Sequence, residues 1–107
     1  MANVSPEMKE TQRFFASTIS EELKKLENQS NPETKMIIND ALIQIKKLEM
    51  DYENLKIDLT KSGDDNRVIF AMIKNFQNRI DILQNTLKHI ENIKQLNNFN
   101  NESNSNI

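Results

Sequence analysis

The chain has 107 residues, of which 36% are hydrophobic and 28% charged, and its mean hydropathy is −0.70. This length fits one domain, and the polarity is typical of long helices that each bury a single stripe. One glycine and two prolines exclude hairpin-rich β folds, and the absence of cysteine excludes disulfides and thiolate metal sites. The net charge of −2 comes without a basic cluster or stacking aromatics, so we expect no nucleic-acid partner.

A first helix is predicted over residues 6–29, after an N-terminal leader formed by residues 1–5. Ser5, Pro6 and Glu7 match an N-cap, a proline at the first helical position and an acid in the first turn. The apolar residues that follow at helical spacing are Met8, Phe15, Ile19, Leu23 and Leu26, with Phe14 beside them. One face of this helix is therefore expected to pack on the rest of the chain.

A second helix is predicted over residues 32–61, because Asn31-Pro32-Glu33 repeats the same start signal. Its front seam alternates steps of three and four residues as in a coiled coil, and consists of Ile38, Ala41, Ile45, Leu48, Tyr52, Leu55 and Leu59. A second row, which we call the rear stripe, recurs every seven residues on the opposite side and consists of Met36, Ile43, Met50 and Ile57. A helix that is apolar on two opposite sides must cover both.

The sequence leaves two interpretations of the rear stripe open. In one, the helix over 6–29 lies against it while the third helix lies against the front seam. In the other, the stripe is a protein interface, either for a second copy in a weak homodimer or for a different protein. Two of the four side chains are methionines, which repack readily and suit an adaptable binding surface.

A third helix is predicted over residues 65–96, after a turn in which Gly63 is the C-cap of the second helix and an aspartate caps the third. Its seam consists of Ile69, Ile73, Phe76, Ile80, Leu83, Leu87 and Ile90. The predicted fold is all-α, an elongated antiparallel three-helix bundle over residues 6–96 with a long coiled-coil-like hairpin of its second and third helices. Residues 97–107 are rich in Asn and Ser and are expected to be a disordered tail.

No constellation of catalytic residues is apparent in the sequence. His89 is the only histidine and lies off the seam of the third helix, so it is interpreted as a solvated side chain. The carboxylates lie off the seams or at caps, and Gly63 stands alone rather than in a phosphate-binding loop. We therefore expect no catalytic residue, no cofactor and no metal site, and interpret the chain as a non-enzyme.

Four segments carry a family resemblance: Val4–Phe15 (VSPEMKETQRFF), Ile38–Leu42, Leu48–Lys56, and Ser62–Gln84 (SGDDNRVIFAMIKNFQNRIDILQ). Together they resemble the soluble C-terminal region of small single-span bacterial membrane proteins. Those proteins are regarded as anti-sigma factors and occur beside sigma factors of the extracytoplasmic-function type. The likeness extends over most of residues 3–96, but its motifs carry no known chemistry.

The resemblance implies a domain on the periplasmic side of the inner membrane. A cytoplasmic segment would bind the sigma factor, and a transmembrane helix would connect it to this domain. Both parts lie outside this chain, and the leader is expected to be the junction to the membrane segment. The sigma factor and the membrane would thus be contacted only through those parts.

The residues and the resemblance together give one hypothesis of function. The chain is interpreted as a non-enzymatic protein-interaction or sensor domain, the periplasmic part of a membrane-anchored, anti-sigma-factor-like regulator. The alternative is a cytoplasmic helical adaptor, chaperone or structural spacer, because no export signal is visible in the sequence.

Overall fold

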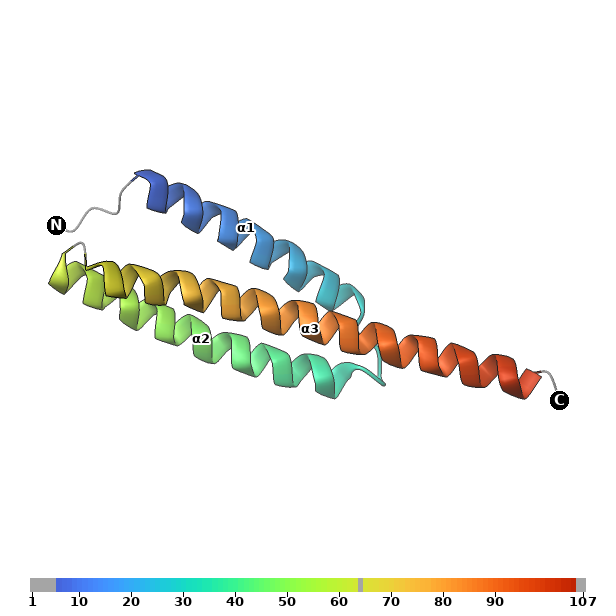
Figure 1. The fold of residues 1–107 in the computed structure, drawn as a ribbon. Helices are drawn as coiled ribbons and strands as arrows, with labels where there is room; N and C mark the ends of the chain where they lie inside the picture. The colour runs from blue at the N-terminus through green and yellow to red at the C-terminus, as the bar shows by residue number, and fades with distance from the viewer. Residues whose placement is uncertain (1–5, 64, 106–107) are drawn as a thin grey trace.

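The computed structural model describes residues 6–63 and 65–105, with side chains as far as Asn98. It contains helices α1 (Pro6–Asn28), α2 (Lys35–Ser62) and α3 (Asn66–Ser105). α1 and α3 run in the same direction and α2 runs against both, so the molecule is an elongated bundle about 69 Å long (Figure 1). The predicted fold class, an all-α three-helix bundle with a long α2–α3 hairpin, is confirmed.

α3 is the central element of the bundle. In Figure 1, α1 lies along one side of α3 and α2 along the other. The larger core cluster joins Ile19 and Leu26 of α1 to Phe76, Leu83 and Ile90 of α3. It also includes residues of the front seam, which are Ile38, Ala41 and Ile45. The sequence periodicity thus correctly identified the faces that meet.

A smaller core cluster lies near the α2–α3 turn. It is built from Met8, Leu59 and Met72, one residue from each helix, and Met72 is fully buried. Tyr52 packs against both clusters and links them. The bundle therefore has a continuous apolar interior from the start of α1 to the middle of α3.

The turn between α2 and α3 follows the predicted capping pattern. Gly63 has φ +76° and ψ −140°, and its N–H donates to the Leu59 carbonyl at 2.9 Å, as a glycine C-cap should. The Asp65 carboxylate accepts a hydrogen bond from the Arg67 N–H at 2.9 Å and so caps α3. Hydrogen bonds from the backbone N–H and the side chain of Arg67 hold the pKa of Asp65 below its ordinary value.

The start of α2 differs from the prediction, because the helix begins at Lys35 and not at residue 32. The Asn31 side-chain oxygen accepts hydrogen bonds from the N–H groups of Glu33 and Thr34, at 2.9 and 3.0 Å. These bonds close a turn over residues 31–34 before the helix can start. Thr34, only 1% exposed, then anchors this turn by donating to the Gln29 carbonyl at 2.8 Å.

The end of α3 also differs, because the helix continues to Ser105 where the sequence predicted a disordered tail from residue 97. Between residues 97 and 105 there is neither proline nor glycine to stop a helix. Lys94 also donates to Gln29, and Asn97 donates to the Glu33 carboxylate at 2.6 Å, so polar contacts hold α3 beside the α1–α2 connection. Residues 106–107, the leader 1–5 and its predicted Ser5 cap lie outside the described residues.

Candidate protein-interaction surface

The rear stripe lies on the solvent side of α2. Its four side chains are 78% (Met36), 68% (Ile43), 63% (Met50) and 52% (Ile57) exposed. On the opposite side of the same helix, the seam residues Ile38, Ala41, Ile45 and Leu59 are no more than 5% exposed. The helix is therefore apolar on two opposite sides, and the described residues cover only one of them.

The interpretation in which helix 6–29 covers the rear stripe is wrong. The apolar face of α1 meets α3 instead, where the Phe15 ring stacks on the Phe76 ring with centroids 5.3 Å apart. α1 makes few contacts with α2, and one of them is a hydrogen bond of 2.9 Å from the Gln12 amide to the Tyr52 hydroxyl. Because α1 follows α3, it leaves the far side of α2 open.

Polar and charged residues flank the rear stripe on both sides. One flank lies three residues after each stripe position and consists of Asn39, Lys46, Glu53 and Thr60. The other lies four residues after each and consists of Asp40, Lys47, Asn54 and Lys61. All eight are exposed. An apolar centre between polar rims is the usual layout of a protein interface.

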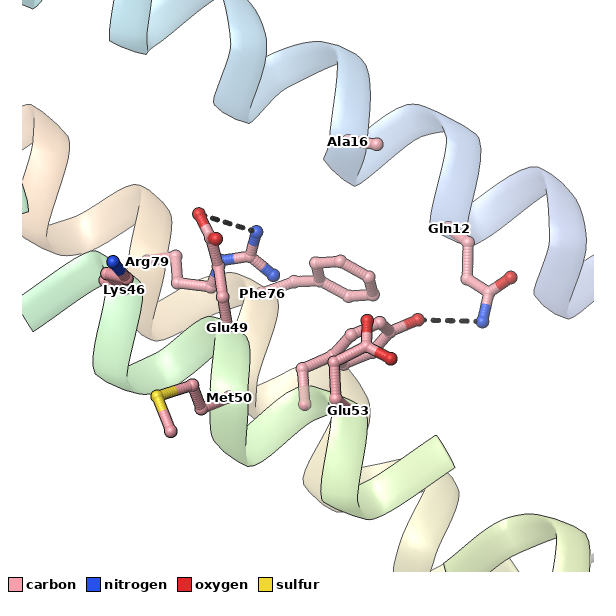
Figure 2. A pocket seen from close by; sticks show the side chains of 9 residues that line it. Gln12, Ala16, Lys46, Glu49, Met50, Glu53, Phe76 and Arg79 are labelled. Carbon is pink, nitrogen blue, oxygen red and sulfur yellow. Dashed lines mark hydrogen bonds and ion pairs between the residues drawn. The ribbon is translucent and has the colours of Figure 1, made fainter. Parts of the chain in front are cut away.

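An open groove of about 470 Å³ runs beside the stripe, between α1 and α2, with α3 as its floor (Figure 2). Figure 2 shows Gln12 and Ala16 on the α1 side, Lys46, Glu49, Met50 and Glu53 on the α2 side, and Phe76 and Arg79 below. Met50 belongs both to the lining of this groove and to the rear stripe, and its side chain points away from Arg79. The groove and the rear stripe are thus adjacent surfaces on the same helix, α2.

Arg79 is the most unusual charged residue of the groove. Its guanidinium lies 5.5 Å from the centre of the Phe76 ring and 6.0 Å from that of Tyr52, and it pairs with Glu49 at 4.0 Å. Its Nε is buried and has no hydrogen-bond partner among the described residues. Burial lowers the pKa of Arg79, although an arginine in such a position remains a cation at neutral pH.

These contacts indicate a packing role for the Arg79 side chain. Its aliphatic part and guanidinium cover the edge of the core where α1 and α2 diverge, as amphipathic side chains often do. Burial raises the pKa of the Tyr52 hydroxyl, and the hydrogen bond from Gln12 has a smaller, opposite effect. The carboxylates of the groove are engaged separately, Glu49 with Arg79 and Glu53 with Lys56 at 3.4 Å.

The remaining candidate residues are placed as follows. His89 is exposed, as predicted. Tyr52, a residue of the predicted front seam, is a half-buried core aromatic whose hydroxyl accepts a hydrogen bond from Gln12. Within residues 6–63 and 65–105, no group of three or more His, Cys, Asp or Glu side chains is placed to hold a metal ion. In the same residues no helix is long and apolar enough to cross a bilayer.

Sequence reasoning missed a buried polar residue, Asn75. It is 5% exposed, and its amide donates to the Leu48 carbonyl of α2 at 2.8 Å while its oxygen lies 3.5 Å from Arg79. A signal exists in retrospect, because Met72, Asn75 and Arg79 follow one another in steps of three and four beside the predicted seam. This second row is buried at Met72 and Asn75 and half-buried at Arg79, because α3 contacts helices on two sides.

Comparison with known proteins gave no match to a protein-family model, to a curated protein or to a solved structure.

Proposed function

We propose that this chain is a non-enzymatic protein-interaction domain that acts by associating with a second copy through the rear stripe. The observation that carries the proposal is the row of four large apolar side chains, each more than half exposed, on a helix whose opposite side packs against the rest of the bundle. Isolated exposed apolar residues are common, but a regular row of them along about six turns of one helix indicates an interaction site.

The expected association is weak. Full burial of one Ile or Met side chain contributes about 1.5–3 kcal/mol, and these side chains are already partly covered, so about 1 kcal/mol each is realistic. Eight such side chains in a dimer would supply roughly 8 kcal/mol, against an association cost of about 4–15 kcal/mol. Because the gain from apolar burial is close to the cost of association, we expect a dimer that forms at high local concentration and dissociates easily, as a regulatory contact requires.

Replacement of Met50 by glutamate tests the proposal. In the wild-type protein we expect the mass measured by light scattering to rise from monomer toward dimer with concentration. In Met50→Glu it should stay monomeric, because the dimer would bury a charge at the centre of the stripe. Far-UV circular dichroism should be unchanged, since the residue contributes little to the core of its own chain.

A matched control is Phe70→Glu, which removes a similarly exposed apolar side chain (71%) outside the stripe. Self-association of this variant should equal that of the wild-type protein. A wild-type protein that is monomeric at every concentration, or a Phe70→Glu variant as impaired as Met50→Glu, would contradict the proposed role of the stripe.

The resemblance of Val4–Phe15 and Ser62–Gln84 supports a second element of the proposal, the compartment. We place the domain on the periplasmic side of the inner membrane, as part of an anchored, anti-sigma-factor-like regulator whose sigma-binding segment lies outside this chain. Association of two domains would then bring two anchors, and two cytoplasmic segments, together. A cytoplasmic adaptor, chaperone or spacer is the alternative.

A reporter fusion distinguishes these compartments. Alkaline phosphatase, which folds only outside the cytoplasm, would be fused behind residue 107 of the natural gene product and expressed in a Gram-negative host. We expect an active phosphatase in the membrane fraction. If the phosphatase fusion is inactive, a fluorescent protein that folds in the cytoplasm would be fused at the same position instead. A soluble and fluorescent fusion would then favour the cytoplasmic adaptor.

A further inference from the structure

We propose that the second copy binds antiparallel, with the two α2 helices crossing at Met50 on the two-fold axis. This proposal rests on the self-association proposed above and adds its geometry. Three kinds of observation carry it: the seven-residue step of the stripe, the charges on its flanks, and the bounds of α2.

The step of seven residues selects a helix as the structure that covers the stripe. Seven residues in two turns correspond to 3.5 residues per turn, so on a straight helix the row drifts by about 20° per heptad. A partner that follows the row must wrap around α2 with a small left-handed crossing of about 20°. A second α2 helix carries the identical row and can follow it along its length.

The flanks decide between parallel and antiparallel pairing. In an antiparallel pair related by a two-fold axis perpendicular to the helices, each flank faces the same flank of the second copy. In a parallel pair, each flank faces the opposite one. The parallel arrangement therefore places Lys46 beside Lys47 of the second copy, twice, and like charges at such a position destabilise the pair.

An antiparallel pair with Met50 on the axis brings together residues whose numbers add up to about 100. Ile43 then meets Ile57 of the second copy, and Met50 meets its own equivalent. On one flank Lys46 meets Glu53, and on the other Asp40 meets Lys61. Each ion pair occurs twice by symmetry, and the remaining flank contacts, Lys47 with Asn54 and Asn39 with Thr60, involve at most one charge.

Other antiparallel registers match less well. An axis midway between Ile43 and Met50 sets Lys46 and Lys47 each against its own equivalent. An axis midway between Met50 and Ile57 sets Glu53 against its equivalent and Lys47 against Lys61. An axis at Ile43 would pair Asp40 with Lys47, but it leaves Ile57 about six residues beyond the start of the partner helix at Lys35.

The flank side chains can reach these partners from their positions in the monomer. Those of Asp40, Lys46 and Lys61 form no ion pair or hydrogen bond within the described part of the chain, and all are exposed. Glu53 pairs with Lys56 on its own helix, but both side chains are more than half exposed, so this contact contributes little and can be exchanged. Figure 2 shows Lys46 and Glu53 on the same side of α2.

Because the chain contains no cysteine, single cysteines can report the register directly. Helix axes about 8–10 Å apart place facing Cα atoms roughly 4–5 Å from each other, which is within disulfide range. Under mild oxidation, Met50→Cys should cross-link to itself. Ile43→Cys and Ile57→Cys should each stay monomeric alone, since the equivalent residues lie about 20 Å apart, but should cross-link when mixed.

The alternatives give different cross-linking patterns. Self-cross-linking of both Ile43→Cys and Ile57→Cys would overturn the proposal in favour of a parallel pair. Efficient cross-linking between Ile43→Cys and Met50→Cys would overturn it in favour of the shifted register. The control is Gln77→Cys on the exposed side of α3, which gives the collisional background.

A charge reversal provides an independent test. Lys46→Glu should weaken self-association about fivefold or more, because it faces Glu53 of the second copy at two places. The double variant Lys46→Glu/Glu53→Lys should recover most of this loss, and high salt should diminish both effects. If the double variant associates as weakly as Lys46→Glu alone, the proposed register is wrong. If association persists without these patterns, the register is wrong and the function of the stripe stands; if no association occurs, the proposed function itself fails.

Discussion

Replacement of Leu83 by alanine is expected to reduce the free energy of unfolding by about 3 kcal/mol. Leu83 is completely buried at the centre of α3, in the cluster that joins all three helices. Its removal leaves a cavity that three long helices can close only partly, so the lost transfer energy and the cavity cost add. Urea unfolding followed by far-UV circular dichroism measures the change, and the thermal midpoint should fall by roughly 10 °C or more.

The control for this prediction is Leu96→Ala, the same change on the same helix at a side chain that is 60% exposed. It should alter stability by no more than about 0.5 kcal/mol. Equal effects of the two substitutions would mean that the packing of α3 between α1 and α2 is not the main source of stability.

Replacement of Thr34 by valine is expected to cost about 2 kcal/mol, although the two side chains have nearly the same shape. The Thr34 hydroxyl is buried and donates to the Gln29 carbonyl at 2.8 Å, while it accepts a hydrogen bond from the Asn31 N–H at 3.0 Å. Valine would leave these two backbone groups without their partner in a partly buried connection. Chemical unfolding of the purified variant measures the loss.

Thr60→Val is the matched control. The Thr60 hydroxyl is exposed and donates only to the Lys56 carbonyl of its own helix, at 3.0 Å. Its loss should change stability by less than about 0.5 kcal/mol. If Thr34→Val is equally harmless, water replaces the hydroxyl and the connection is less closely packed than its burial indicates.

The sequence predicted the helices and the faces that meet, because both depend on local regularities. The three- and four-residue steps of the front seam and of the α3 seam identify buried faces without knowledge of the partner. Gly63 and Asp65 are equally local signals, since a positive φ angle and a side-chain cap each need only their immediate neighbours. The position of the rear stripe also follows from spacing once the front seam is known, but its exposure does not, because the sequence left open whether α1 covers it.

Other features depend on competition that spacing does not reveal. Asn31 could cap a helix or close a turn, and the buried Thr34 hydroxyl favours the turn. The position of α1 was open because its single apolar face fits either side of the hairpin. The length of α3 was underestimated because composition was taken as evidence of disorder, whereas Lys94 and Asn97 make specific contacts with the α1–α2 connection.

The placement of α1 against α3 has a consequence for the order of folding. α2 and α3 are joined by a short turn, and their contacts include pairs as near in sequence as Tyr52 and Phe76, which are 24 positions apart. α1 reaches α3 only across about 60 residues, as between Phe15 and Phe76, so its docking must overcome a larger loop-closure entropy. We therefore expect the hairpin to form first and α1 to join last. The same helix would then be the first to detach when the native state opens locally, leaving the α2–α3 hairpin and its rear stripe in place.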